Sequence, residues 1–150
     1  MRKIFVLSAL FLTVVAAMAT AACICHDERP IKFDELPTQA QSFVKEHFAD
    51  EKISHVIEDK EFMGNEYKVV FLSGTKVEFD RSGAWTEVDC RYTAVPAQLV
   101  PKAVADYVKT NYPESSIMEL RREHGGCEVK LTGGLELTFN KAGKLVDIDD

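Results

Sequence analysis

A long internal repeat constrains the fold of this chain more than any other feature. The segment YKVVFLSGTKVEFDRSGAWTEVD (67–89) aligns without a gap with CEVKLTGGLELTFNKAGKLVDID (127–149). Upstream, LPTQAQSFVKEHF (36–48) aligns with VPKAVADYVKTNY (100–112). Because self-similarity over most of a chain indicates a repeated structural unit, the sequence predicts two tandem repeats, residues 36–90 and 95–150.

Each repeat has the pattern of one helix followed by four strands. Apolar residues recur at helical spacing in 36–48 and in 100–112. Alternating runs with turn residues between them follow in both repeats. The chain is therefore predicted to be an α+β protein with an eight-stranded antiparallel sheet. Both helices would cover one face of this sheet, and the other face would be open.

The turn that follows the third predicted strand is the best matched part of the repeat. It reads DRSG in the first copy and NKAG in the second. Asp80 and Asn140 are favourable first residues of a tight turn, and Gly83 and Gly143 can adopt the positive φ that reverses the chain. The motif predicts a hairpin turn, and it lacks the further carboxylates of a calcium loop.

The N-terminus has the pattern of a secretion signal. Arg2 and Lys3 precede an apolar run, and the small residues Ala19, Thr20 and Ala21 fit a cleavage site before Ala22. Residues 1–21 are predicted to be a cleaved signal peptide, 22–34 an extended segment and 35–150 a single domain. The protein is predicted to be periplasmic or secreted, without membrane insertion after cleavage. Attachment as a lipoprotein through Cys23 is the less favoured alternative, because Thr20 stands where an apolar residue is preferred.

Charge and motifs narrow the function classes. The chain has a formal net charge of −6 and no run of basic residues, so nucleic acid is a poor partner. No nucleophile elbow, phosphate loop or paired metal-ligating histidines are present. We expect a protein that is not an enzyme and needs no cofactor.

The whole pattern of the two repeats, from LP in the first helix to GLELTF and GKLVDID at the end, resembles the PepSY-like periplasmic proteins of Bacteroidetes. These are similar in fold to the β-lactamase inhibitor protein. The resemblance covers about residues 30–150. It implies a secreted binding module that binds or inhibits a protein or peptide of the periplasm. The chain departs from the expected pattern at Cys127, where the first repeat has the aromatic Tyr67.

Strand alternation predicts which side chains would form the contact surface. Strict alternation places one tryptophan and several charged residues on the open face, namely Trp85, Lys68, Glu78, Glu87, Lys130 and Glu136. Trp85 is the sole tryptophan, and an aromatic residue among charges can anchor a partner. The alternative is that Trp85 caps the sheet edge or packs under the DRSG turn.

The cysteines leave two alternatives open. Cys90 and Cys127 are predicted on the buried side, either as a disulfide between the repeats or as separate thiols. Cys23, Cys25 and His26 are weak candidates for metal ligands near the mature N-terminus. A small-ligand or metal-binding envelope protein is therefore the alternative function, with this segment or a cleft between the repeats as its site.

Overall fold

The computed structural model describes residues 27–61 and 64–150. The first half of the chain contains these elements: β1 (Asp27–Ile31), a short 3-10 helix η1 (Phe33–Glu35), α1 (Thr38–His47), β2 (Ile53–Glu61), β3 (Gly64–Phe71), β4 (Lys76–Phe79) and β5 (Trp85–Asp89). The second half contains α2 (Lys102–Asn111), β6 (Ile117–Glu123), β7 (Gly126–Leu131), β8 (Glu136–Asn140) and β9 (Leu145–Asp149).

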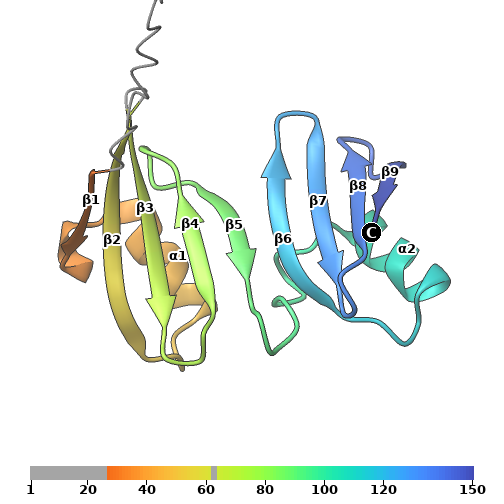
Figure 1. The fold of residues 1–150 in the computed structure, drawn as a ribbon, viewed down its shortest axis with the longest axis horizontal. Helices are drawn as coiled ribbons and strands as arrows, with labels where there is room; N and C mark the ends of the chain where they lie inside the picture. The colour runs from red at the N-terminus through yellow and green to blue at the C-terminus, as the bar shows by residue number, and fades with distance from the viewer. Residues whose placement is uncertain (1–26, 62–63) are drawn as a thin grey trace, which may run out of the picture.

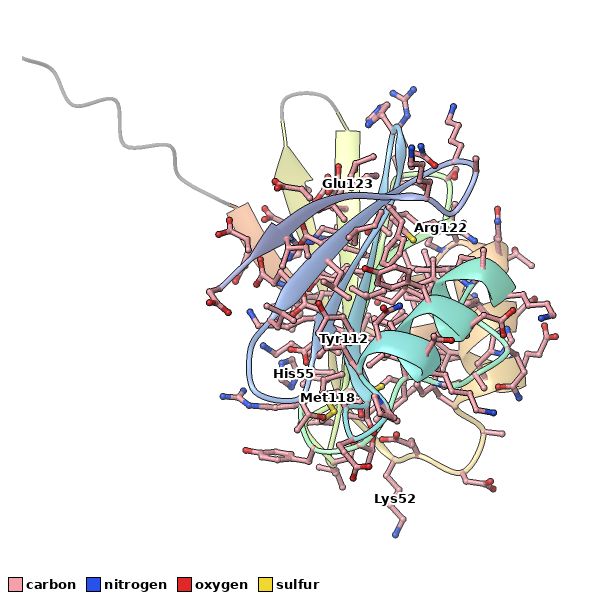
Figure 2. The ribbon with its side chains drawn as sticks, turned by 90° about the vertical axis from the view of Figure 1, so that its right-hand side faces the viewer. Lys52, His55, Tyr112, Met118, Arg122 and Glu123 are labelled. Carbon is pink, nitrogen blue, oxygen red and sulfur yellow. The ribbon has the colours of Figure 1, made fainter. Side chains whose placement is uncertain are left out.

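The strands form one open antiparallel sheet in which spatial order follows chain order from β1 to β9. Both helices lie on the same face (Figures 1 and 2). The α+β class and the single antiparallel sheet are as predicted, but the predicted number of eight strands is wrong. Within the described residues the sheet has nine strands, because residues 27–31 of the expected extended segment pair with β2.

A row of apolar side chains crosses the helix-covered face. Successive cross-strand partners along this row are Val56, Val69, Val77, Val88, Leu120, Val129 and Leu137. All of them are buried. β-Branched and leucine side chains suit a pleated surface that is packed on one side, and their burial supplies the main driving force for this fold.

The helices contribute matching stripes to this core. Pro37 and Pro101 directly precede α1 and α2, where a missing backbone N–H costs nothing. Ala40 and Val44 of α1 are buried, and so are Val104 and Val108 of α2. The spacing of four residues places each pair on one face of its helix, towards the sheet.

The DRSG turn has the predicted geometry. Gly83 has φ of 84°, and its N–H donates to the Asp80 carbonyl at 2.9 Å. The Asp80 carboxylate accepts from the backbone N–H groups of Ser82 and Ala84 at 2.8 and 3.1 Å. Asn140 and Gly143 make the same turn between β8 and β9.

An extra residue interrupts the pairing of β4 with β5. Val77 pairs with Val88, and Phe79 pairs with Trp85. The two pairs are therefore two residues apart along β4 but three residues apart along β5. The equivalent irregularity lies between β8 and β9. Such a β-bulge changes which side of the sheet the bulged strand's following residues face.

Among the described residues, neither helix is long and apolar enough to cross a membrane.

Candidate functional site

Two rows of side chains cross the sheet on the side away from the helices. One row of cross-strand partners is Lys68, Glu78, Glu87, Arg121, Glu128, Thr138 and Asp147. The other is Val70, Lys76, Asp89, Glu119, Lys130, Glu136 and Asp149. We call the surface formed by these two rows the open face. Its carboxylates clearly outnumber its basic side chains.

Five residues of the predicted contact surface lie on the open face, and they are Lys68, Glu78, Glu87, Lys130 and Glu136. Lys68 Nζ lies 3.0 Å from a Glu78 carboxylate oxygen. Lys130 Nζ lies 2.6 Å from a Glu136 oxygen. These ion pairs are partly exposed, so each contributes little to stability, but they order the surface. Their role in binding stays a prediction.

Arg121 occupies the centre of the open face and was missed by the sequence analysis. Its guanidinium contacts three carboxylates, those of Glu87 at 2.8 Å, Glu119 at 2.9 Å and Glu128 at 3.2 Å. The hydrogen bond to Glu87 raises the pKa of Arg121. Adjacent residues of a strand point to opposite faces, so Arg121, which directly follows the apolar Leu120, is expected on the open face from the sequence alone.

One guanidinium does not neutralise the three carboxylates around it. Partial burial, and then repulsion from Glu87, raise the pKa of Glu119 although Arg121 acts in the opposite direction. Burial is the larger cause of this shift, and the repulsion from Glu87 adds to it.

Trp85 does not lie on the open face, so this part of the prediction is wrong. Its side chain is 9% exposed and belongs to the core on the helix side. Phe43 of α1 stacks against it, and the guanidinium carbon of Arg122 lies 3.8 Å from its ring centroid. The β-bulge in β5 is the reason, because it turns Trp85 to the same face as Phe79 and Val88.

Cys90 and Cys127 are separate, buried free thiols. The disulfide alternative is therefore overturned. Strand register explains this, because Cys90 lies beside Met118 and Cys127 beside Arg122. Each residue advances a strand by about 3.3 Å, so the two cysteines are too far apart along the sheet for a disulfide. Burial raises the pKa of Cys90 to about 11 and also raises that of Cys127.

Cys23, Cys25 and His26, the weak candidates for metal ligands, lie outside the described residues. Within 27–61 and 64–150, no group of three or more histidine, cysteine, aspartate or glutamate side chains is arranged to hold a metal ion.

The comparisons with known proteins agree with the resemblance seen in the sequence. A family model described as "Putative beta-lactamase-inhibitor-like, PepSY-like" matches residues 65–147. No curated protein matches the chain.

Three solved structures are similar along nearly their whole length. A "putative calcium-regulated periplasmic protein" from Bacteroides thetaiotaomicron is 41% identical, with a TM-score of 0.80, and 83% of this chain and 98% of that chain are covered. A periplasmic protein of the DUF2874 family from Bacteroides vulgatus is 40% identical, with a TM-score of 0.79 and coverages of 84% and 99%. A periplasmic protein of unknown function from Bacteroides vulgatus is 28% identical, with a TM-score of 0.78 and coverages of 82% and 99%.

The family model covers more than half of the chain, and the fold agrees with that of these periplasmic proteins. The family predicted from the sequence is thereby confirmed. This chain belongs to the PepSY-like family of beta-lactamase-inhibitor-like proteins.

Proposed function

We propose that this protein is a non-enzymatic binding module of the periplasm, and that its open face binds a positively charged segment of another protein or peptide. The observation that carries the proposal is the excess of carboxylates on a sheet face that neither helix covers (Figure 1). The family description favours inhibition of the bound partner as the outcome of binding.

The arrangement around Arg121 gives the open face its chemical preference. Glu87, Glu119 and Glu128 share one guanidinium, and Asp147 and Asp149 make no ion pair with any described side chain. A lysine or arginine of a partner would add the missing positive charge. Complementary charge of this kind speeds association and selects partners more than it raises affinity.

Export is the second part of the proposal. The similar solved structures are periplasmic proteins. We propose that residues 1–21 are removed and that the mature chain begins at Ala22. The mass of the mature protein, purified from the envelope of an expressing bacterium, tests this. A chain that starts at Ala22 supports simple cleavage, whereas a diacylated chain that starts at Cys23 would establish the lipoprotein alternative.

The binding proposal is tested by capture of partners from a Bacteroides envelope extract with immobilised mature protein. The test variant combines Glu119→Gln and Glu128→Gln, which keep the side-chain shape and remove two charges next to Arg121. The matched control combines Glu46→Gln and Glu114→Gln, which remove two charges at exposed positions away from the open face. A far-UV circular dichroism spectrum and an unfolding curve establish that each variant is folded.

We expect a basic protein or peptide that is captured by the wild type and the control variant and lost with the test variant. Its capture should weaken as salt rises, because screening acts on exposed charges. Equal capture by both variants would overturn the assignment of the open face. No specific capture by the wild type would contradict the binding function itself.

A further inference from the structure

A groove lies on the helix side of the sheet, opposite to the open face. It has a volume of about 270 Å³ and lies between β5, β6, the start of α2 and the turn that joins β8 to β9. Trp85, Leu99, Val104 and Leu120 give it apolar walls. Arg122 and Glu123 of β6 also line it, and Figure 2 labels both near the upper end of the sheet, above α2.

The difference between the two repeats explains why this space is open. The register pairs Glu58 with Tyr67 in the first half, and Arg122 with Cys127 at the equivalent place in the second half. Tyr67 packs its ring against the core. Cys127, which lines the groove, lacks the ring that would fill this volume. The departure of Cys127 from the repeat pattern is therefore what leaves a cavity in the second half.

The charges at the two equivalent places also differ. In the first half, Glu58 is buried and accepts hydrogen bonds from Arg29 and Asn65, each at 2.6 Å. In the second half, Arg122 takes this place, and no carboxylate among the described side chains forms an ion pair with it. In the first half, the charge of Glu58 is thus paired with that of Arg29. In the second half, the charge of Arg122 has no paired carboxylate among the described side chains.

The lining of the groove contains two basic side chains, Arg122 and Lys141. Like Arg122, Lys141 makes no ion pair with a described side chain. The one carboxylate of the lining is that of Glu123, and Arg122, Glu123 and Lys141 are all exposed. Partial burial lowers the pKa of Arg122, as expected for a cation that the protein desolvates without a counterion. The lining of the groove therefore has one more basic side chain than carboxylates, in a chain whose formal net charge is −6.

We propose that this groove binds a small ligand in which an apolar group is joined to a carboxylate. The apolar group would lie against Leu99, Val104 and Leu120, and the carboxylate would accept hydrogen bonds from the Arg122 guanidinium. Charge-assisted hydrogen bonds of arginine to carboxylate are among the stronger ones in proteins. The volume lies near the lower limit for ligand sites, so the ligand is small. A free carboxylic acid and the C-terminal residue of a peptide share this chemistry.

The sole tryptophan makes the test direct, because Trp85 lines the groove and its fluorescence reports on binding there. The mature protein is titrated with sodium octanoate and, separately, with an acetylated peptide that ends in Ala-Leu with a free carboxylate. Octanamide and the C-terminally amidated peptide serve as matched neutral probes. Isothermal titration calorimetry repeats each titration, because a change at Arg122 also alters the surroundings of the indole.

We expect a saturable change in Trp85 fluorescence with octanoate, with the peptide acid or with both, and a much weaker change with the matching amide. The acid that saturates the signal shows whether the ligand is a free carboxylic acid or the C-terminus of a peptide. Arg122→Gln should weaken binding by about tenfold or more, the usual effect of losing a charge-assisted hydrogen bond. Cys127→Tyr should abolish binding, because it fills the groove with the side chain that the first half already carries. Arg91→Gln, at an exposed position away from the groove, should bind like the wild type.

Three results would overturn this proposal. One is the absence of saturation with both acids at millimolar concentrations. Another is equal binding of acid and amide, which would remove the role of Arg122. The third is unchanged binding in both folded variants, Arg122→Gln and Cys127→Tyr. Because the open face lies on the other side of the sheet, none of these results bears on the binding of a basic partner there.

Discussion

Phe43 of α1 stacks on Trp85 of β5, with ring centroids 5.8 Å apart and an angle of 29° between the ring planes. This contact joins the first helix to the strand that borders the second half of the sheet (Figure 1). Trp85 is thus a structural residue of the first half and, at the same time, a wall of the groove beside the second half.

Trp85→Ala should therefore destabilise the protein strongly. Removal of a buried large aromatic side chain typically costs about 3–5 kcal/mol, because apolar contacts are lost and a cavity remains. The free energy of unfolding from urea titration, followed by circular dichroism, measures this. Tyr92→Ala is the control, since Tyr92 is 74% exposed and its loss should change stability by less than about 0.5 kcal/mol. Equal stability of the two variants would contradict the burial of Trp85.

Gly83→Ala should also lower stability, through the backbone. Gly83 has φ of +84°, and a Cβ there would lie 2.7 Å from the Pro37 Cβ and 3.0 Å from the Ala40 nitrogen. Strain and crowding together should cost more than about 1 kcal/mol. Gly125→Ala is the control, because nothing lies within 4 Å of its added Cβ. A decrease in melting temperature that is no larger for Gly83→Ala than for Gly125→Ala would count against this turn geometry.

Arg121→Gln should make stability depend more strongly on pH. The raised pKa of Glu119 means that the folded state holds its proton more tightly than the unfolded state does, so stability is lost as pH rises through that pKa, above 4.5. Arg121 offsets part of this loss, and its removal leaves three carboxylates to repel one another. The side chain is 43% exposed, so solvent screening limits the cost at pH 7 to about 1 kcal/mol.

Urea titrations of the wild type and Arg121→Gln at pH 7 and at pH 4 measure this effect. The difference between the two proteins should shrink at the lower pH, where Glu119 is protonated in both. A difference that stays constant with pH would show that Arg121 acts by packing and not by charge.

The buried cysteines should react only after unfolding. In a mature chain that carries Cys23→Ser and Cys25→Ser, Cys90 and Cys127 are the remaining thiols. Burial and the raised pKa of Cys90, about 11, keep its reactive thiolate scarce at pH 8. We expect slow reaction with a disulfide reagent in buffer and prompt reaction of both thiols in guanidinium chloride without reductant. No reactive thiol under the unfolding conditions would establish a disulfide instead.

Much of the architecture followed from the sequence because it depends on short-range patterns. The helical spacing of apolar residues behind Pro37 and Pro101, and the turn chemistry of Asp80 with Gly83, are local properties of the chain. Strand alternation likewise sufficed to place Lys68, Glu78 and Lys130 on the open face. The same alternation places Arg121, the neighbour of the buried Leu120, on the open face, so the position of Arg121 is also encoded locally.

The fold class, the family and the hairpin turns could thus be predicted from the amino-acid sequence, since each of them is encoded within a few residues or in the repeat as a whole. Three features became known from the three-dimensional arrangement of the strands, namely the face on which Trp85 lies, the separation of Cys90 from Cys127, and the additional strand formed by residues 27–31. The physical reason is that all three depend on register between strands that are distant in the sequence. A single bulged residue reverses the face of a side chain, and no local pattern specifies where one strand is shifted against its neighbour.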